Sequence, residues 1–419
     1  MFAINLRFWG RDQIKREWRD ADVLILLLPA LLAILGGLAI RSTESRDISA
    51  DWWWQHWVAG GLGLVLAIVI ARWSYDRLLQ IHWLTYAITN ISLLIVKFAG
   101  NTVNGSQRWL SIGGVNIQPS EFAKLGLIIT LAAVLHQRPI KHPLDMLKVL
   151  PVVSLPWFLI FIQPDLGTAL VFVVITLGML YWAGAKLGWL ILLGSPLISA
   201  IIFNFHVPIW LGWVAFTGVL AWTTLPWFRM ISTVVAVVVN LVAVEIGNLL
   251  WSFLADYQKD RLVLFLDPSK EPLGGGYHLI QSRIAIGAGK LWGKGIMQGT
   301  QTKLDFIPEQ HTDFIFSAIG EELGFIGCAF VLVVFMAICW RLLVIALKSR
   351  DDFGSLIAIG FFSLILFQAM VNIGMTIGLA PVTGIPLPWI SYGRSAMIAN
   401  FIALGLVESV MLHRRTIKF

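Results

Sequence analysis

Long apolar runs separated by short polar segments constrain the fold of this chain more than any other feature. Of its 419 residues, 58% are hydrophobic and 13% are charged, whereas a soluble domain carries roughly 25% charged residues. A helix of roughly 20 mostly apolar residues crosses the hydrocarbon core of a bilayer and satisfies its own backbone polar groups. The sequence therefore predicts an all-α polytopic membrane protein.

The apolar runs indicate about twelve transmembrane helices. The predicted spans are 23–40, 56–72, 80–98, 121–136, 147–162, 167–184, 188–204, 207–224, 229–250, 323–346, 354–378 and 394–412. The predicted divisions are an N-terminal segment (1–21), helices one to nine (22–250), a long loop (251–322), helices ten to twelve (323–412) and a tail (413–419).

Lysine and arginine predict the orientation of these helices. They occur within residues 1–21, at Arg72, Arg77, Arg138, Lys141, Lys148, Lys186, Arg229, Lys348 and Arg350, and in the tail. With twelve helices all of these positions fall on one side, which the positive-inside rule makes cytoplasmic. We expect segment 1–21 to lie on the cytoplasmic face and loop 251–322 to face outward. The net charge of +7 is explained by this topology and does not indicate nucleic-acid binding.

The stretch Gln301–Gly320 gathers acidic residues at a predicted membrane edge. Asp305, Glu309, His311 and Asp313 lie close together just before apolar sequence resumes. Ionisable groups near a bilayer usually mark a functional site, and Asp313 is the candidate for its centre. No second His or Cys lies at a spacing that supports zinc. A hard divalent cation, Mg²⁺ or Mn²⁺, that bridges carboxylate and phosphate is chemically reasonable.

Further polar residues lie on the same predicted outer side. They are Arg108 in loop 99–120, Glu121 and Lys124 at one helix start, Asp165 at another, Arg283 and Lys294 in the long loop, and Ser391 in the proline-rich segment 381–395. Glu121 and Lys124 form either a local ion pair at a helix start or a pair that lines a cavity. Arg283 and Lys294 are candidate phosphate contacts, or charges that are solvated or internally paired.

The motifs together resemble the SEDS family of polytopic cell-wall polymerases, typified by RodA, FtsW and SpoVE. The resemblance rests on QRWL (107–110), QPSE (118–121), QPDLGT (163–168), DYQKDR (256–261), GTQTKLDFIPEQHTDFIF (299–316) and NIGMTIGLAPVTGIPLPWISYG (372–393), in that order. These strings are most similar to the elongation branch of the family, that of RodA.

The resemblance implies a function for the site. Members join lipid II, a lipid-linked disaccharide peptide, into glycan strands on the outer face of the bacterial cytoplasmic membrane, beside a class B penicillin-binding protein that cross-links the peptides. It implies that Asp313 is the catalytic acid–base residue of an inverting glycosyltransferase serving the elongation machinery. Arg108, Glu121, Lys124 and Asp165 match further family positions.

Two departures from the family pattern are visible. Arg394 replaces the second glycine of the usual Ser-Tyr-Gly-Gly-Ser motif. The family has ten helices, and residues 185–256 here hold three apolar runs where one is usual, which predicts an extra pair of helices. Two other functions also fit the pattern: a lipid II flippase or other transporter, and a non-catalytic scaffold for the transpeptidase. Polymer formation by the isolated chain, with flipping assayed separately, would separate the three.

Overall fold

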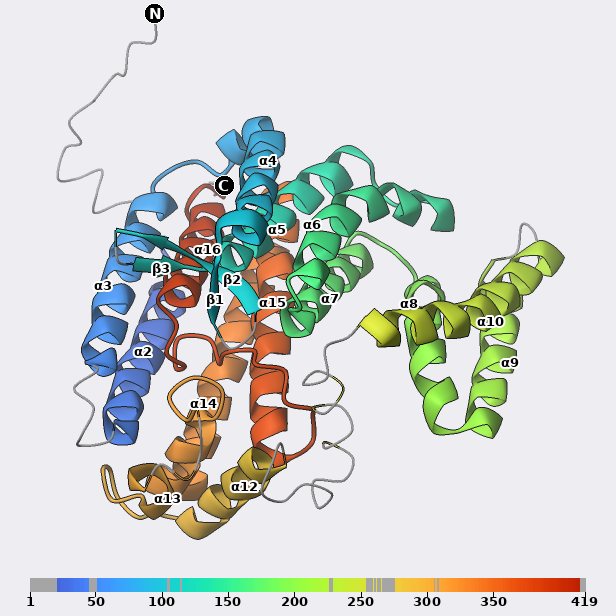
Figure 1. The fold of residues 1–419 in the computed structure, drawn as a ribbon. Helices are drawn as coiled ribbons and strands as arrows, with labels where there is room; N and C mark the ends of the chain where they lie inside the picture. Colours follow the sequence, from blue (N-terminus) through green and yellow to red (C-terminus); the bar gives the residue numbers. More distant parts are fainter. Residues whose placement is uncertain are drawn as a thin grey trace, which may run out of the picture.

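A computed structural model describes residues 21–44, 51–103, 106–113, 115–225, 229–253, 259, 261, 265, 276–304, 306 and 309–414. Segment 1–20, Asp305 and residues 415–419 of the predicted tail lie outside these residues. The described chain forms a bundle of long helices with a small sheet on one side (Figure 1). Ten of its helices are long and apolar enough to cross a membrane, and two further apolar helices are shorter.

The long helices follow the order of the predicted spans. They are α2 (Val23–Thr43), α3 (Trp52–Ala71), α4 (Asp76–Ala99), α5 (Pro119–Gln137), α8 (Leu187–Phe205), α9 (Val207–Thr224), α10 (Arg229–Phe253), α14 (Ile315–Lys348), α15 (Asp352–Ile377) and α16 (Arg394–Leu412). The shorter apolar helices are α6 (Leu150–Ile162) and α7 (Leu166–Trp182), and η1 (Pro143–Lys148) is a 3-10 turn. The helices α12 (Tyr277–Gly289) and α13 (Thr300–Lys303) lie between α10 and α14.

In the described chain every predicted span contains a helix, and ten of these twelve helices are long and apolar enough to cross a membrane, whereas α6 and α7 are shorter. The largest difference is α14, which begins at Ile315, eight residues before the predicted start at 323. Glu321 and Glu322 interrupt the apolar pattern there, but both side chains are buried and hydrogen-bonded inside the protein. The prediction ended the loop at these glutamates because charged residues usually lie outside a span. In the structure they lie within the helix, because their side chains have buried polar partners.

A three-stranded antiparallel sheet lies between α4 and α5, and the all-α prediction did not anticipate it. The strands β1 (Asn101–Val103), β2 (Ser106–Ile112) and β3 (Val115–Ile117) pair in sequence order. A turn that contains Gly113, in the left-handed conformation, joins β2 to β3. Two short polar–apolar runs around a Gly-Gly pair are a hairpin signal, and this signal was present in the loop 99–120.

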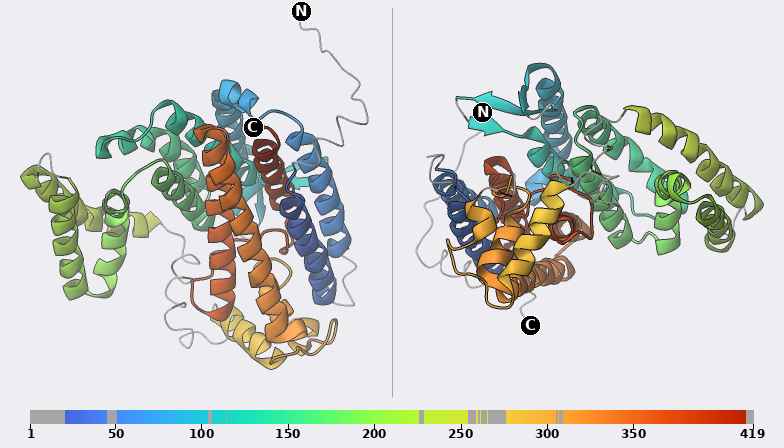
Figure 2. Two further views of the ribbon diagram at one scale, coloured as in Figure 1. Left: turned by 180° about the vertical axis from the view of Figure 1, so that it is seen from behind. Right: turned by 60° about the horizontal axis from the view of Figure 1, so that its bottom comes forward.

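The core of the bundle is formed by α5, α15 and α16, whose spans are the most buried. They pack with α3, α4, α7 and α14 around one continuous apolar cluster (Figure 2). Small residues allow close helix contacts in membrane proteins, and Gly63 of α3 faces Phe401 of α16 in this way. The core thus holds the ends of these helices, and the loops between them, in fixed positions.

The helices α8, α9 and α10 form a group beside the main bundle (Figure 1). The group has its own small apolar core, and hydrogen bonds join its helices: Asn240 Nδ2 donates to Ser195 Oγ at 3.0 Å, and Trp210 Nε1 donates to Ser199 Oγ at 2.8 Å. Buried polar contacts of this kind join helices within a bilayer. Glu245 of α10 is exposed on the outside of this group, and nothing in the structure explains it.

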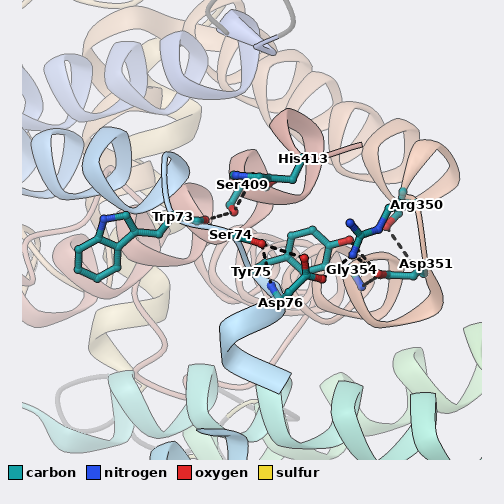
Figure 3. Close-up of polar contacts among 10 residues, drawn as sticks. Trp73, Ser74, Tyr75, Asp76, Arg350, Asp351, Gly354, Ser409 and His413 are labelled. Atoms are coloured by element: carbon teal, nitrogen blue, oxygen red, sulfur yellow. Dashed lines mark hydrogen bonds and ion pairs between the residues drawn. The ribbon is translucent and has the colours of Figure 1, made fainter. Parts of the chain in front are cut away.

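The end of the bundle where α3 and α14 finish is closed by a polar network (Figure 3). Tyr75 Oη donates to Asp351 Oδ2 at 2.9 Å, and Arg350 pairs with Asp76 at 2.6 Å and with Asp351 at 3.2 Å. Asp351 also caps α15, because its Oδ1 accepts from the Gly354 backbone N–H at 2.9 Å. The turn between α3 and α4 is thereby joined to the turn between α14 and α15.

Candidate active site

Asp313 lies in a tight turn at the opposite end of the bundle, directly before α14. The backbone N–H groups of Thr312 and Asp313 donate to the Glu309 carbonyl at 3.2 and 3.1 Å. The Asn372 amide of α15 donates to the Asp313 carbonyl at 3.1 Å and to the Ile385 carbonyl at 2.8 Å. One side chain thus joins the Asp313 turn to the proline-rich segment, and the aspartate backbone is fixed.

The Asp313 carboxyl faces charges of both signs. A Cβ atom on Gly384 would lie 3.5 Å from both Asp313 Oδ2 and Arg261 Nη1, which places this glycine against the two groups. Burial raises the pKa of Asp313 to about 6; Arg261 and Arg108 lower it, while Glu309 and Asp165 raise it. A base is most efficient when its pKa lies near the working pH, so this carboxyl is suited to accept a proton near neutrality.

Arg108 and Asp165 lie together, and both act electrostatically on the Asp313 carboxyl. Arg108 of β2 lies 3.7 Å from Asp165 Oδ2, measured from Nη1, and also donates to the Pro164 carbonyl. Asp165 Oδ1 caps α7 by accepting from the Thr168 N–H at 3.1 Å. Since both residues act electrostatically on Asp313, three distant parts of the sequence contribute to one charged site.

Gly167, in the first turn of α7, allows close packing against the proline-rich segment. A Cβ atom at Gly167 would lie 2.7 Å from the Thr383 carbonyl oxygen. The first turn of α7 therefore packs directly on the backbone just before Gly384, which itself faces Asp313.

Glu121 and Lys124 form a closed ion pair inside the bundle. Lys124 Nζ lies 2.6 Å from Glu121 Oε2, and the two side chains are 2% and 3% exposed. They occupy the first turns of α5, where the helix dipole favours an anion. The structure thus contains the predicted pair in a desolvated form. Any role in substrate binding would require the pair to open.

Ser391 fastens the proline-rich segment to the Asp313 turn. Its Oγ donates to the Thr312 carbonyl at 2.6 Å and accepts from the Leu387 N–H at 2.8 Å. The Tyr392 N–H donates to the His311 carbonyl at 2.9 Å. These contacts give Ser391 a positioning role next to Asp313, while direct contact with substrate stays a prediction.

The His311 ring makes an aromatic contact with α3. The ring stacks on Trp52 with centroids 3.9 Å apart, and burial lowers its pKa. The neutral ring is therefore held by α3, and we find no group of three or more His, Cys, Asp or Glu side chains able to hold a metal ion in the described part of the chain.

Arg283 and Lys294 belong to a different neighbourhood. Lys294 Nζ pairs with Glu321 at 2.8 Å and donates to Thr300 Oγ1 at 2.6 Å. Arg283 is exposed on α12 and packs beside Gly378, at the end of α15. The ammonium group of Lys294 is already paired, so a phosphate would have to displace Glu321.

Sequence reasoning missed two contributors to the site, Arg261 and Asn372. Both lie within motifs that the sequence displayed, at the end of DYQKDR and at the start of NIGMTIG. Arg261 was not distinguishable in the sequence, because an arginine in a charged loop acquires a role only through its neighbours. Asn372 had one signal, since a fully buried amide within a span needs partners.

Known proteins match nearly the whole length of this chain. The family model described as cell cycle protein, for FtsW, RodA and SpoVE, matches residues 20–211 and 209–416. Peptidoglycan glycosyltransferase MrdB of Escherichia coli strain K12 is 34% identical over 412 residues, 97% of this chain and 96% of that protein. Peptidoglycan glycosyltransferase RodA of Treponema pallidum is 34% identical over 425 residues, 93% of this chain and 97% of that protein.

Solved structures agree with these matches. A chain of a peptidoglycan synthase complex, in work on the coordination of polymerization and crosslinking, has a TM-score of 0.68 and 29% identity, covering 94% of this chain and 98% of that one. Rod shape determining protein RodA of Thermus thermophilus has a TM-score of 0.63 and 26% identity, with coverages of 94% and 98%. The two pieces of the family match meet at the start of α9, within the group that holds the additional apolar runs.

Proposed function

Because the chain belongs to the FtsW, RodA and SpoVE family, we propose that it is a peptidoglycan glycosyltransferase that polymerises lipid II into glycan strands. The observation that supports this most strongly is the position of Asp313. Its carboxyl has a pKa raised to about 6, on a fixed backbone, with Arg108 and Arg261 in its electrostatic field. Glycosyl transfer from a pyrophosphate donor needs a base that accepts the hydroxyl proton and cations that stabilise the leaving pyrophosphate.

In the proposed step, a hydroxyl of the acceptor sugar attacks the anomeric carbon of the donor disaccharide. The new carbon–oxygen bond forms as the bond to the lipid pyrophosphate breaks, and the bonding electron pair leaves with the pyrophosphate. Asp313 accepts the hydroxyl proton. Direct displacement of this kind inverts the anomeric centre.

The positively charged side chains near Asp313 have a separate role in this step. The pyrophosphate gains negative charge as it leaves, and fixed positive groups stabilise such charge strongly in a site that excludes water. Arg108 and Arg261 act on Asp313 and are the nearest candidates. Asp165 holds Arg108 in place through their ion pair, and Lys124 becomes available only if its pair with Glu121 opens.

A divalent cation, Mg²⁺ or Mn²⁺, would act here by neutralising the pyrophosphate. The described residues that face Asp313 include the carboxyl groups of Asp165 and Glu309, but they do not form a three-ligand group with it. We therefore propose that such a cation is held jointly by a carboxylate and the substrate phosphates. Chelation with EDTA should then slow polymerisation.

The proposed location is the cytoplasmic membrane of a bacterium, with Asp313 on the outer side. The opposite end of the bundle carries the basic turns at Arg72, Arg77, Lys348 and Arg350. Such turns face the cytoplasm, so the end with Asp313 faces outward. A substrate carried in the outer leaflet would reach the site there.

We propose a class B penicillin-binding protein as partner and cell elongation as the process. The first is supported by the solved peptidoglycan synthase complex, which concerns polymerization and crosslinking. The second is supported by the similarity to MrdB and RodA. Depletion of the protein should convert rod-shaped cells to round cells, whereas filamentous cells would instead indicate a role in division.

The direct test uses the purified chain in liposomes supplied with lipid II. Glycan strands resolved by gel electrophoresis are the expected product, and an assay of lipid II flipping in the same vesicles should show no dependence on the protein. Absence of polymer in the presence of the partner transpeptidase would contradict the proposal and would favour a scaffold. Flipping without polymerisation would favour a transporter.

A further inference from the structure

The segment that follows α12 is bonded backbone to backbone to α14. We call residues 290–297 the clamp segment. The Phe325 N–H donates to the Lys290 carbonyl at 2.9 Å, and the Ile326 N–H donates to the Leu291 carbonyl at 3.2 Å. In the other direction, the Gly295 N–H donates to the Glu322 carbonyl at 2.9 Å. The clamp segment is therefore held rigidly against α14.

Two glycines make this close approach possible. Gly293 and Gly324 both have positive φ angles, 78° and 65°, and α14 is kinked at Gly324. A Cβ atom on Gly293 would collide with the Glu322 carbonyl, and one on Gly324 would collide with the Gly293 nitrogen. The glycines of this region thus serve backbone packing and do not form a phosphate-binding loop.

This rigid structure presents an apolar surface, which we call the interfacial patch. It comprises Leu291 (51% exposed), Trp292 (77%), Ile296 (53%), Phe325 (65%) and Ile326 (44%). Contiguous apolar surface that a protein leaves exposed marks an interaction site. Because the backbone hydrogen bonds fix these residues, their exposure is a property of the fold.

The length of α14 gives the depth of the interfacial patch in the membrane. Residues 325–348 span about 36 Å at 1.5 Å per residue, enough to cross a hydrocarbon core of roughly 30 Å. Ser42, near the end of α2, donates to the Glu322 carboxylate, so Glu322 lies level with the end of another span. The length of α14 and the level of Glu322 both place Phe325 at the edge of the hydrocarbon layer. Leu291 and Trp292 lie beside Phe325.

We propose that the interfacial patch inserts into the lipid bilayer at the boundary between headgroups and acyl chains, so that the lipid surface is its partner. Phe325 and Ile326 of the patch belong to α14, whose next two turns also expose Phe330, Leu332 and Val333. Tryptophan is enriched at this boundary, and Trp292 is the most exposed member of the patch. Lys290 is exposed directly beside it, where a cation meets lipid phosphates.

Insertion would set the height of the candidate active site above the membrane. Glu321 accepts from the N–H groups of Thr300 and Thr302, which fastens α13 to α14. Gln310 Nε2 in turn donates to the carbonyls of Thr302 and Thr43 at 3.0 Å each. A series of hydrogen bonds thus connects α14, which carries part of the interfacial patch, to the turn that holds Asp313. The lipid contact itself does not depend on the proposed function.

The test measures contact between single side chains and lipid. Trp292→Cys is labelled with an environment-sensitive fluorophore, reconstituted in phosphatidylglycerol–phosphatidylcholine vesicles, and quenched with lipids that carry a nitroxide near the headgroup. Phe330→Cys on α14, outside the interfacial patch and exposed, is the lipid-facing reference, and Ser111→Cys on the exposed face of β2 is the aqueous reference. The native Cys328 and Cys339 are buried, so wild type measures background labelling.

We expect the label at 292 to lose fluorescence to the lipid quencher, as the label at 330 does, and to resist aqueous iodide. The label at 111 should show the reverse. Quenching at 292 by iodide and not by lipid would overturn the proposal, and would mean that water or another protein covers the interfacial patch. Labelled Leu291→Cys gives a second reading if the change at 292 disturbs folding.

Discussion

The two ends of the helical bundle use charged residues in opposite ways. At the end that carries Tyr75, the charges of Asp76, Arg350 and Asp351 meet specific partners. The Asp351 carboxylate accepts from a phenol, a guanidinium and a backbone N–H (Figure 3). At the other end, the structure fixes the backbone of Asp313 through Asn372 and the Glu309 turn. The Asp313 carboxyl lies in a field of two arginines and two acids.

The difference separates charges that stabilise the fold from a charge that is available for chemistry. Burial, followed by the bond to Asp351, raises the pKa of Tyr75, so the phenol remains a donor. The same physical cause, burial, raises the pKa of Asp313 toward neutrality, where a proton can be accepted and released. Matched substitutions at the two ends should therefore have opposite consequences for activity and stability.

The largest effect is expected from the change of Asp313→Asn compared with Asp351→Asn. Loss of a general base costs about 10²–10⁴-fold in rate, so Asp313→Asn should abolish most polymerisation of lipid II. Its melting temperature should not fall, because the amide has the size of the carboxyl and carries no charge that burial would disfavour. Asp351→Asn, the same chemical change, should retain activity and lower the melting temperature; equal activity of the two variants would remove the distinction between the ends.

The buried pair of Glu121 and Lys124 should show the next largest effect. Lys124→Met leaves Glu121 desolvated and without its partner, which costs about 3–5 kcal/mol of folding free energy. The double variant E121L/K124M should recover most of that stability in a thermal unfolding assay. An unchanged melting temperature in Lys124→Met would mean that the pair is solvated. Activity of the stable double variant then shows whether the pair also binds substrate.

Removal of Arg108 should shift the titration of Asp313. Arg108 lowers the pKa of that carboxyl, so Arg108→Met should raise it. The acidic limb of the plot of kcat/KM against pH should move to higher pH, because the base stays protonated over a wider range. An acidic limb that does not move would mean that Arg108 does not act on Asp313, whatever happens to the rate itself.

The smallest effect is expected from Tyr75→Phe. This change removes a single hydrogen bond to Asp351, worth about 0.5–1.5 kcal/mol. A small decrease in melting temperature with unchanged kcat/KM is the expected outcome. A large loss of activity would connect the two ends of the bundle and would contradict their separation into a stabilising and a reactive end.

Part of this arrangement was predictable from the sequence. Apolar run lengths gave the helices, because lipid forces a spanning segment to satisfy its own backbone. The crowding of acids before α14 identified Asp313. The order of the predicted spans placed Arg108 and Asp165 on the same predicted side as Asp313, and the structure brings Arg108 and Asp165 together.

Other features depend on tertiary contacts that no local pattern encodes. The sequence predicted that Glu321 lies at the end of the long loop. In the structure it is a buried residue of α14 that accepts hydrogen bonds from α13. Lys294 resembled a phosphate contact, and its partner proved to be that same carboxylate. Arg261 joined the site only through the fold, since an isolated arginine in a long loop carries no signal of its neighbours.

The pH dependence of the wild-type protein tests the central claim most directly, because it measures the carboxyl itself. If Asp313 is the base, kcat/KM for lipid II polymerisation should rise with pH and level off above an apparent pKa of about 6. An ordinary exposed aspartate would titrate near pH 3.9. A rate that is flat between pH 5 and pH 8, and equal in Asp313→Asn, would contradict the assignment of Asp313 as the proton acceptor.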